Sequence, residues 1–142
     1  MPLVSLTRLH IRAFRHLPMF ALSALLSAQE AKAAPGNIAV ALLAEARRTF
    51  WTRTVWSDEA ALGAFMRMNA HRGAMGKLSQ WCDEAAVARW TQPTAEPPSW
   101  DEAWQRMQRD GRTSSIRRPA PAHANFQIAP PQIGRFSELR LK

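Results

Sequence analysis

The sequence is poor in the residues that build cross-links and metal centres. Cys82 is the single cysteine among 142 residues, so no disulfide can form within the chain and a CxxC redox or zinc site is excluded. The four histidines are scattered, without an HxxxH or HxH pair. We therefore expect no metal and no other cofactor. Such sparse cysteine is typical of a reducing compartment, which favours the cytoplasm.

Long hydrophobic runs are also missing. The apolar stretch Met19–Ala28 contains Ser23 and Ser27 and is too short to span a bilayer. Arginines before it and small residues after it give residues 1–34 the outline of a secretory signal. Residues 3–12 nevertheless alternate as a strand does, so we favour a strand followed by a core helix over an export signal.

The positive charge is concentrated at the two ends of the chain. Of the net charge of +8, residues 1–48 contribute +4, residues 49–111 contribute −1 and residues 112–142 contribute +5. The tail from Arg112 is basic and rich in proline, and we expect it to be extended or disordered. A basic tail can attract nucleic acid or anionic lipid. No recognition motif accompanies it, so specific nucleic-acid binding is not expected.

The remaining sequence predicts strands and helices in alternation. Period-two and helical spacings, with capping residues at Asp58 and Ser99 and stops at Pro35-Gly36 and Gly111, define the boundaries. We expect strands over residues 3–12, 38–46, 50–56 and 85–91, and helices over residues 17–28, from 57 or 58 onward, over 70–78 after a kink near Asn69, and over 99–111. In the third strand, Trp51 and Arg53 face one side and Trp56 the other.

The order strand, helix, strand, strand, helix, strand is the ferredoxin-like β-α-β-β-α-β arrangement of an α+β fold. We predict one domain over residues 1–111, with a four-stranded antiparallel sheet, both helices on one face and an extra C-terminal helix, followed by the tail over residues 112–142. Such a sheet leaves its other face uncovered, and an apolar face must be buried. We expect a second subunit to cover it, which makes the protein a homodimer.

The stretch FWTRTVWSDEAALGAFMRMNAHRGAM, followed by a strand, resembles the central motif of the dimeric α/β-barrel superfamily, which includes antibiotic-biosynthesis-monooxygenase-like proteins. The opening MPLVSLTRLHIR and residues 115–123 resemble DUF3291-type proteins, with a more distant similarity to spheroidene monooxygenase. The resemblance covers residues 1–123 and implies a dimeric α/β barrel. It leaves the activity open, because this superfamily hosts oxygenases, isomerases, haem-degrading enzymes and proteins with no assigned reaction.

The resemblance argues against haem. The haem-degrading branch uses an Asn on the first strand, a Trp on the second helix and a haem-ligating His. The matching places here hold Thr7 or Arg8, Phe65 and Met75. A haem-dependent carotenoid-type oxygenase is therefore only a second alternative, suggested by the distant similarity.

The monooxygenase-like branch works without metal or flavin and holds an aromatic substrate in an apolar pocket. By this resemblance we predict a cofactor-independent monooxygenase-like protein that acts on a small hydrophobic or aromatic substrate in a pocket between sheet and helices. Arg53 would stabilise a developing enolate or phenolate, and His71 would take the proton. The predicted substrate-binding residues are Trp51, Trp56, Phe65, Arg72 and Trp90.

Each of these residues also has a plainer explanation. His71 can cap or pack a helix break, Arg72 can be solvated, and large aromatics are more often core or dimer contacts than catalytic groups. The alternative function is therefore a non-catalytic hydrophobic-ligand-binding or accessory protein of the same fold.

Overall fold

The computed structural model of the chain describes residues 1–45, 48–68, 73, 77, 79–114, 119–124, 128, 130–131 and 138–142. The strands are β1 (Leu3–Ile11), β2 (Asn37–Glu45), β3 (Thr49–Trp56), β4 (Cys82–Thr91), β5 (Arg112–Thr113) and β6 (Glu138–Arg140). The helices are η1 (Phe14–His16), α1 (Leu17–Ala33), α2 (Glu59–Met66), α4 (Trp100–Asp110) and α5 (Pro121–Ala124). The predicted kink at Asn69 and most of the predicted helix over 70–78 lie outside these residues.

The strands form one antiparallel sheet in the order β5-β4-β1-β3-β2-β6. Its four long strands have the predicted ferredoxin-like order. The prediction of a four-stranded sheet is wrong, because the sheet has six strands. Two short strands from beyond residue 111 add to the two edges, where β5 pairs with β4 and β6 pairs with β2. Unpaired edge strands offer free N–H and C=O groups, and these segments satisfy part of them.

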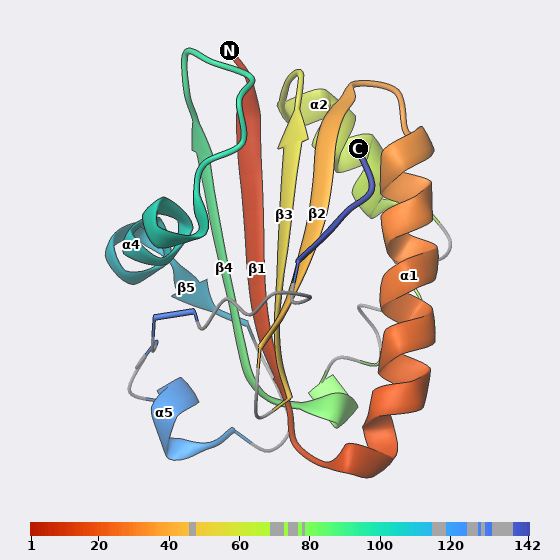
Figure 1. Ribbon diagram of the computed structural model, residues 1–142, viewed down its shortest axis with the longest axis vertical. Helices are drawn as coiled ribbons and strands as arrows, with labels where there is room; N and C mark the ends of the chain where they lie inside the picture. Colours follow the sequence, from red (N-terminus) through yellow and green to blue (C-terminus); the bar gives the residue numbers. More distant parts are fainter. Residues whose placement is uncertain are drawn as a thin grey trace.

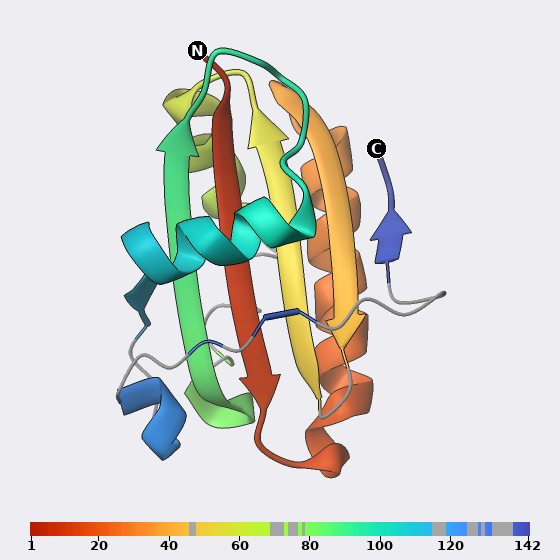
Figure 2. The ribbon, with the colours of Figure 1, turned by 60° about the vertical axis from the view of Figure 1, so that its left-hand side comes forward.

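Both faces of the sheet are covered by helices. Figure 2 shows α4 crossing one face, while α1 and α2 lie behind the other. Side chains alternate along each strand, so in β1 Val4 and Leu6 pack in the cluster under α4, whereas Leu3 and Leu9 pack in clusters on the side of α1. This explains why the long strands are apolar on both sides.

Helix α4 corrects the expectation of an uncovered face. The Ser99 hydroxyl accepts a hydrogen bond from the Glu102 amide at 3.1 Å and caps the helix. Trp100, Ala103 and Met107 are then buried against the sheet. Since the same chain covers this face, the sheet no longer supplies an argument for a dimer. The homodimer itself stays a prediction.

The turn between α1 and β2 packs tightly against the start of α2 (Figure 1). Gly36 has a φ of 85°, and a Cβ there would lie 2.5 Å from the Cβ of Ala61 and 2.7 Å from the hydroxyl of Ser57. Only glycine fits this conformation and this approach. Asp58 accepts a hydrogen bond from the Ala61 amide at 2.8 Å and caps α2, as predicted. Among the described helices, none is both long and apolar enough to cross a bilayer.

Removal of the α4 cap tests how much this helix contributes to the fold. Ser99→Ala should lower the free energy of unfolding by about 1 kcal/mol, the usual effect of losing an N-cap hydroxyl. Urea denaturation followed by circular dichroism measures the change. Ser99→Thr keeps the hydroxyl and should retain most of the stability. Equal stabilities for the wild type and Ser99→Ala would show that the cap does not support the covered face.

Candidate functional site

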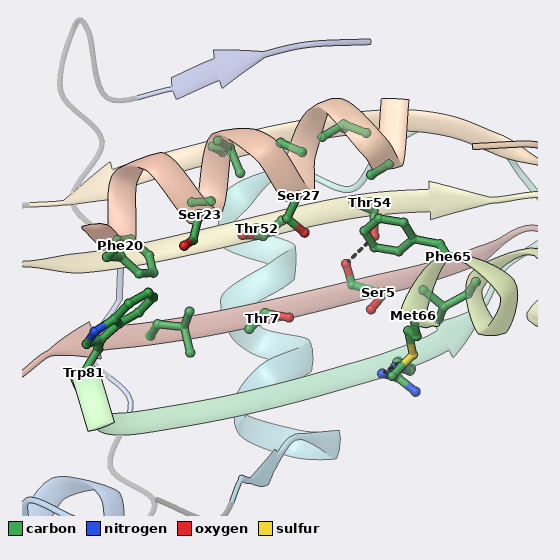
Figure 3. A pocket seen from close by; sticks show the side chains of 18 residues that line it. Ser5, Thr7, Phe20, Ser23, Ser27, Thr52, Thr54, Phe65, Met66 and Trp81 are labelled. Carbon is green, nitrogen blue, oxygen red and sulfur yellow. Dashed lines mark hydrogen bonds between the residues drawn. The ribbon is translucent and has the colours of Figure 1, made fainter. Parts of the chain in front are cut away.

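A pocket lies between the sheet and the helices α1 and α2, where one was predicted. Its cavity volume is about 120 Å³. Figure 3 shows the sheet forming its floor and α1 one of its walls. Phe20 and Trp81 lie at one end, with ring centroids 6.4 Å apart and nearly perpendicular rings, and Phe65 and Met66 of α2 lie at the other.

Four hydroxyl side chains form the floor of the pocket. Ser5 and Thr7 lie on β1, Thr52 and Thr54 on β3, and the register places Ser5 opposite Thr54 and Thr7 opposite Thr52. Residues two apart on a strand point to the same face. The floor is therefore a compact square of hydroxyls in the middle of an otherwise apolar sheet.

Helix α1 adds two more hydroxyls and leaves space above the floor. Ser23 and Ser27 are four residues apart, so they lie on the same side of the helix. Figure 3 shows both directed toward the strands. The other side chains that α1 places along the pocket beyond Phe20 are alanines: Ala24, Ala28 and Ala31. Small residues facing a floor of small residues leave the cavity between them.

Three of these hydroxyls have no side-chain hydrogen-bond partner among the described residues. The Thr54 hydroxyl accepts a hydrogen bond from the Trp56 indole at 2.8 Å and donates to the Ser5 carbonyl at 3.4 Å. Thr7, Ser23 and Thr52 make no side-chain hydrogen bond with another described residue. These three residues are half-buried, so a ligand or water in the pocket can use their hydroxyls.

Arg89 of β4 carries the charge at the rim. Its Nη2 lies 3.3 Å from the Met66 sulfur, and the residue is exposed. Burial of part of the side chain and the charge of Arg112 lower the pKa of Arg89, while Glu59 opposes them. An arginine remains cationic at neutral pH despite such a shift. Among the described lining residues there is no His, Cys, Asp, Glu or Lys.

The structure divides the predicted site residues between the two faces of the sheet. Phe65 lines the pocket. Trp56 does not line the pocket but stacks on Phe65, with ring centroids 5.1 Å apart. Trp51 and Trp90 pack in the cluster under α4, on the opposite face. His71 and Arg72 lie outside the described residues.

Arg53 also lies on the α4 face, where its guanidinium is fully used. It is 3% exposed, donates to the Pro98 carbonyl at 2.8 Å and pairs with Glu138 at 3.3 Å. It also stacks on the Trp100 ring at 4.4 Å. Burial lowers the pKa of Arg53 more than Glu138 raises it. Arg53 therefore connects the loop before α4 and the strand β6 to the sheet, and it does not line the pocket.

A second polar cluster joins β1 to the start of β4. The His10 Nδ1 lies 2.5 Å from Asp83, and Arg8 donates to Glu84 at 2.9 Å. His10, Asp83 and Glu84 offer three potential metal-ligand atoms within 4.8 Å of one another. Arg8 already balances a carboxylate there, so the cluster is built as an ion-pair network. Burial and the neighbouring Asp83 raise the pKa of the Cys82 thiol to about 12, which rules it out as a nucleophile at neutral pH.

The family is decided by a match over most of the chain. A family model described as "Domain of unknown function (DUF3291)" matches residues 26–119. The chain belongs to DUF3291. The predicted resemblance is thereby confirmed, and the match runs from α1 to beyond β5. No curated protein matches the sequence.

Several solved structures share the fold. SnoaB from Streptomyces nogalater, described as a cofactor-independent oxygenase, aligns with a TM-score of 0.55 and 15% identity over 68% of the DUF3291 chain and 98% of its own. A conserved protein from Methanosarcina mazei aligns with a TM-score of 0.59 and 15% identity over 65% and 93%. An antibiotic biosynthesis monooxygenase aligns with a TM-score of 0.58 and 13% identity over 65% and 99%. At such identities the likeness shows the fold and leaves the reaction open.

The hydroxyl groups were the part of the site that sequence reasoning missed. Their signal is present in the sequence as Ser5 with Thr7, Thr52 with Thr54, and Ser23 with Ser27. The first two pairs have strand spacing and the third has helical spacing. Each pair interrupts an apolar pattern at positions that should face the core, which marks a place where the core is left unfilled.

The hydrogen bonds of the Glu138 carboxylate on the α4 face are expected to weaken in acid. Its Oε1 accepts hydrogen bonds from Trp100 at 3.1 Å, Arg140 at 3.2 Å and Arg53 at 3.3 Å. Burial alone would raise the pKa of Glu138, but the hydrogen bonds from Arg140 and Trp100 and the charges of Arg140 and Arg53 outweigh it, so the pKa lies below its usual 4.5. A carboxylate whose pKa is lowered in the folded state contributes its full stabilisation above pH 4.5. That contribution is lost as the pH falls through the pKa of the folded state.

Glu138→Gln should therefore flatten the acid limb of the stability profile. Urea denaturation at a series of pH values from neutral downward should show a smaller loss of unfolding free energy below pH 4.5 in this variant than in the wild type. Arg140→Gln should flatten the same limb in part, because it removes the strongest of the groups that lower the pKa. Parallel profiles for the wild type and Glu138→Gln would refute the assignment.

Proposed function

We propose that this DUF3291 protein binds a small, mostly apolar molecule with a hydroxyl or carbonyl group in the pocket between α1, α2 and the sheet. The observation that supports this most is a set of three hydroxyls that face one cavity from β1, α1 and β3 and have no partner among the described residues: Thr7, Ser23 and Thr52. Ligand pockets typically combine mostly apolar walls with a few convergent polar groups. The aromatic walls and the hydroxyl floor have this composition.

The size of the cavity limits the ligand. A volume of about 120 Å³ is close to the roughly 150 Å³ apolar cavity that holds benzene in another protein. A single aromatic ring or a short acyl chain therefore fits. A polycyclic molecule would have to project through the opening or displace α2.

The charge at the rim favours a ligand with a polar or anionic end. Arg89 is exposed and cationic beside Met66, so a carboxylate or phenolate that reaches the opening would meet it. The exposed position of Arg89 means that this interaction contributes only modestly to the binding free energy.

The predicted cytoplasmic location is consistent with the buried, reduced Cys82.

A panel of small molecules tests the proposal through thermal stability. A ligand that binds only the folded state stabilises it by about 2.7 kcal/mol at a hundred times its dissociation constant. Phenol and benzoate should raise the unfolding temperature, and glucose, as a polar control, should not. Arg89→Met should weaken benzoate binding about two- to fivefold and leave phenol binding unchanged.

Ser23→Leu provides the control for the location of binding. Its side chain fills the cavity with apolar atoms, so the variant should be at least as stable as the wild type and should lose the response to both ligands. Ser23→Ala keeps the space and removes one of the three hydroxyls, so it should still bind both ligands, but a few-fold more weakly than the wild type. Responses that persist in a folded Ser23→Leu protein would contradict binding in this pocket.

A second candidate is the cofactor-independent oxygenase, which the shared fold with SnoaB, described as such an oxygenase, favours. Arg53 lies on the other face of the sheet, so Arg89 and the predicted proton acceptor His71 would have to provide the polar groups. An oxygen electrode should then record uptake that requires a bound electron-rich phenol, persists with a chelator present and is lost in Ser23→Leu and His71→Ala. If the protein binds the phenol but consumes no oxygen, the oxygenase proposal is refuted and the ligand-binding proposal stands.

A further inference from the structure

Helix α1 turns four of its five large aliphatic side chains away from the protein. Met19, Leu22, Leu25 and Leu26 are 43% to 52% exposed. The side toward the sheet carries Phe20, the half-buried Leu17 at the first position, and otherwise alanines and the two serines of the pocket. A surface helix normally has the opposite arrangement, with its largest apolar side chains facing the core.

The exposed residues form one continuous stripe. Met19, Leu22 and Leu26 follow the spacing of neighbours on a single helix face, and Leu25 widens it. Phe14 of η1, the short turn just before α1, is a further exposed apolar side chain at 71% exposure. From Met19 to Leu26 the stripe covers two turns of the helix, about 10 Å. A contiguous apolar surface of this kind marks an interaction site.

Positive charge flanks the stripe at both ends. Arg15 is exposed at the N-terminal end, and the guanidinium of Arg48 lies 4.4 Å from the centre of the Phe14 ring. At the C-terminal end, Lys32 is exposed and the Lys142 ammonium bonds to its carbonyl. The first turns of η1 and α1 contain no acidic residue. Basic residues at a helix N-terminus oppose the helix dipole, and a bound anion would offset this.

This charge pattern disfavours a second copy of the chain as the partner. If two α1 helices packed antiparallel, Arg15 of one copy would meet Lys32 of the other, and parallel packing would bring Arg15 against Arg15. Neither arrangement supplies a carboxylate from the stripe, since Glu30 is the one acid in α1 and is half-buried. Like charges brought together across an interface oppose association.

We propose that α1 docks on the surface of an anionic membrane, with Phe14, Met19, Leu22 and Leu26 entering the interface and the flanking cations contacting lipid headgroups. Helices that lie in the membrane surface combine an apolar face with basic residues in this way. Each cation near an anionic surface strengthens binding by about fivefold. The opposite side of α1 lines the pocket, so docking would bring the pocket to about one helix diameter, roughly 10 Å, from the lipid. The docking proposal itself is independent of ligand binding, and only this functional connection between pocket and lipid rests on the proposed ligand binding.

Vesicle co-sedimentation of the full-length protein tests the docking. The protein should sediment with vesicles of phosphatidylcholine and phosphatidylglycerol in equal parts, bind vesicles of phosphatidylcholine alone at least tenfold more weakly, and dissociate as salt is raised. Leu22→Ser/Leu26→Ser and Arg15→Gln/Lys32→Gln should each reduce binding by about tenfold or more. These side chains are exposed, so both variants should keep the unfolding temperature of the wild type.

A matched control changes a residue away from the stripe. Arg109→Gln removes an exposed cation on α4, which covers the other face of the sheet. This variant should bind anionic vesicles as the wild type does. No sedimentation of the wild type with anionic vesicles, or wild-type binding by Leu22→Ser/Leu26→Ser, would overturn the proposal. A dimer in analytical ultracentrifugation that dissociates in Leu22→Ser/Leu26→Ser, without vesicle binding, would assign the stripe to a second copy instead.

Discussion

The structure depends on one constraint, which is that both faces of a central antiparallel sheet must be buried. β1 lies between β3 and β4, and most of its residues are buried whichever way they point. Helices α1 and α2 cover one face and α4 covers the other, as the two ribbon views show (Figures 1 and 2). The two coverings differ in kind. The α4 side is filled by tryptophan and aliphatic side chains, whereas the α1 side contains hydroxyls and a cavity.

This difference separates stability from function within one sheet. Arg53 is a charge in the densest part of the molecule, and it is tolerated because Pro98, Glu138 and Trp100 surround it with partners. The pocket contains no such network among its described residues. Its empty space lowers stability relative to a filled core, and proteins commonly accept that cost at a binding site.

Local patterns were enough to predict the four long strands and the two capped helices. Alternation identified the faces of β3 correctly, and Asp58 and Ser99 cap α2 and α4 as expected. The edge strands β5 and β6 have two and three residues, too few to show any periodicity. Arg53 was misleading for a related reason. Its partner Glu138 is 85 residues away, and nothing local shows that a charge among aromatics already has a partner.

Helix α1 cannot be explained by folding alone. A helix selected only to cover a sheet would place its leucines inward and its serines outward, which would fill the cavity and remove the exposed apolar stripe in one step. The chain does the reverse on both sides of the same helix, with Ser23 and Ser27 inside and Leu22, Leu25 and Leu26 outside. Each reversal costs stability, and each is explained by one of the two proposed contacts. A small molecule inside and a lipid surface outside account for both reversals with the same 17 residues.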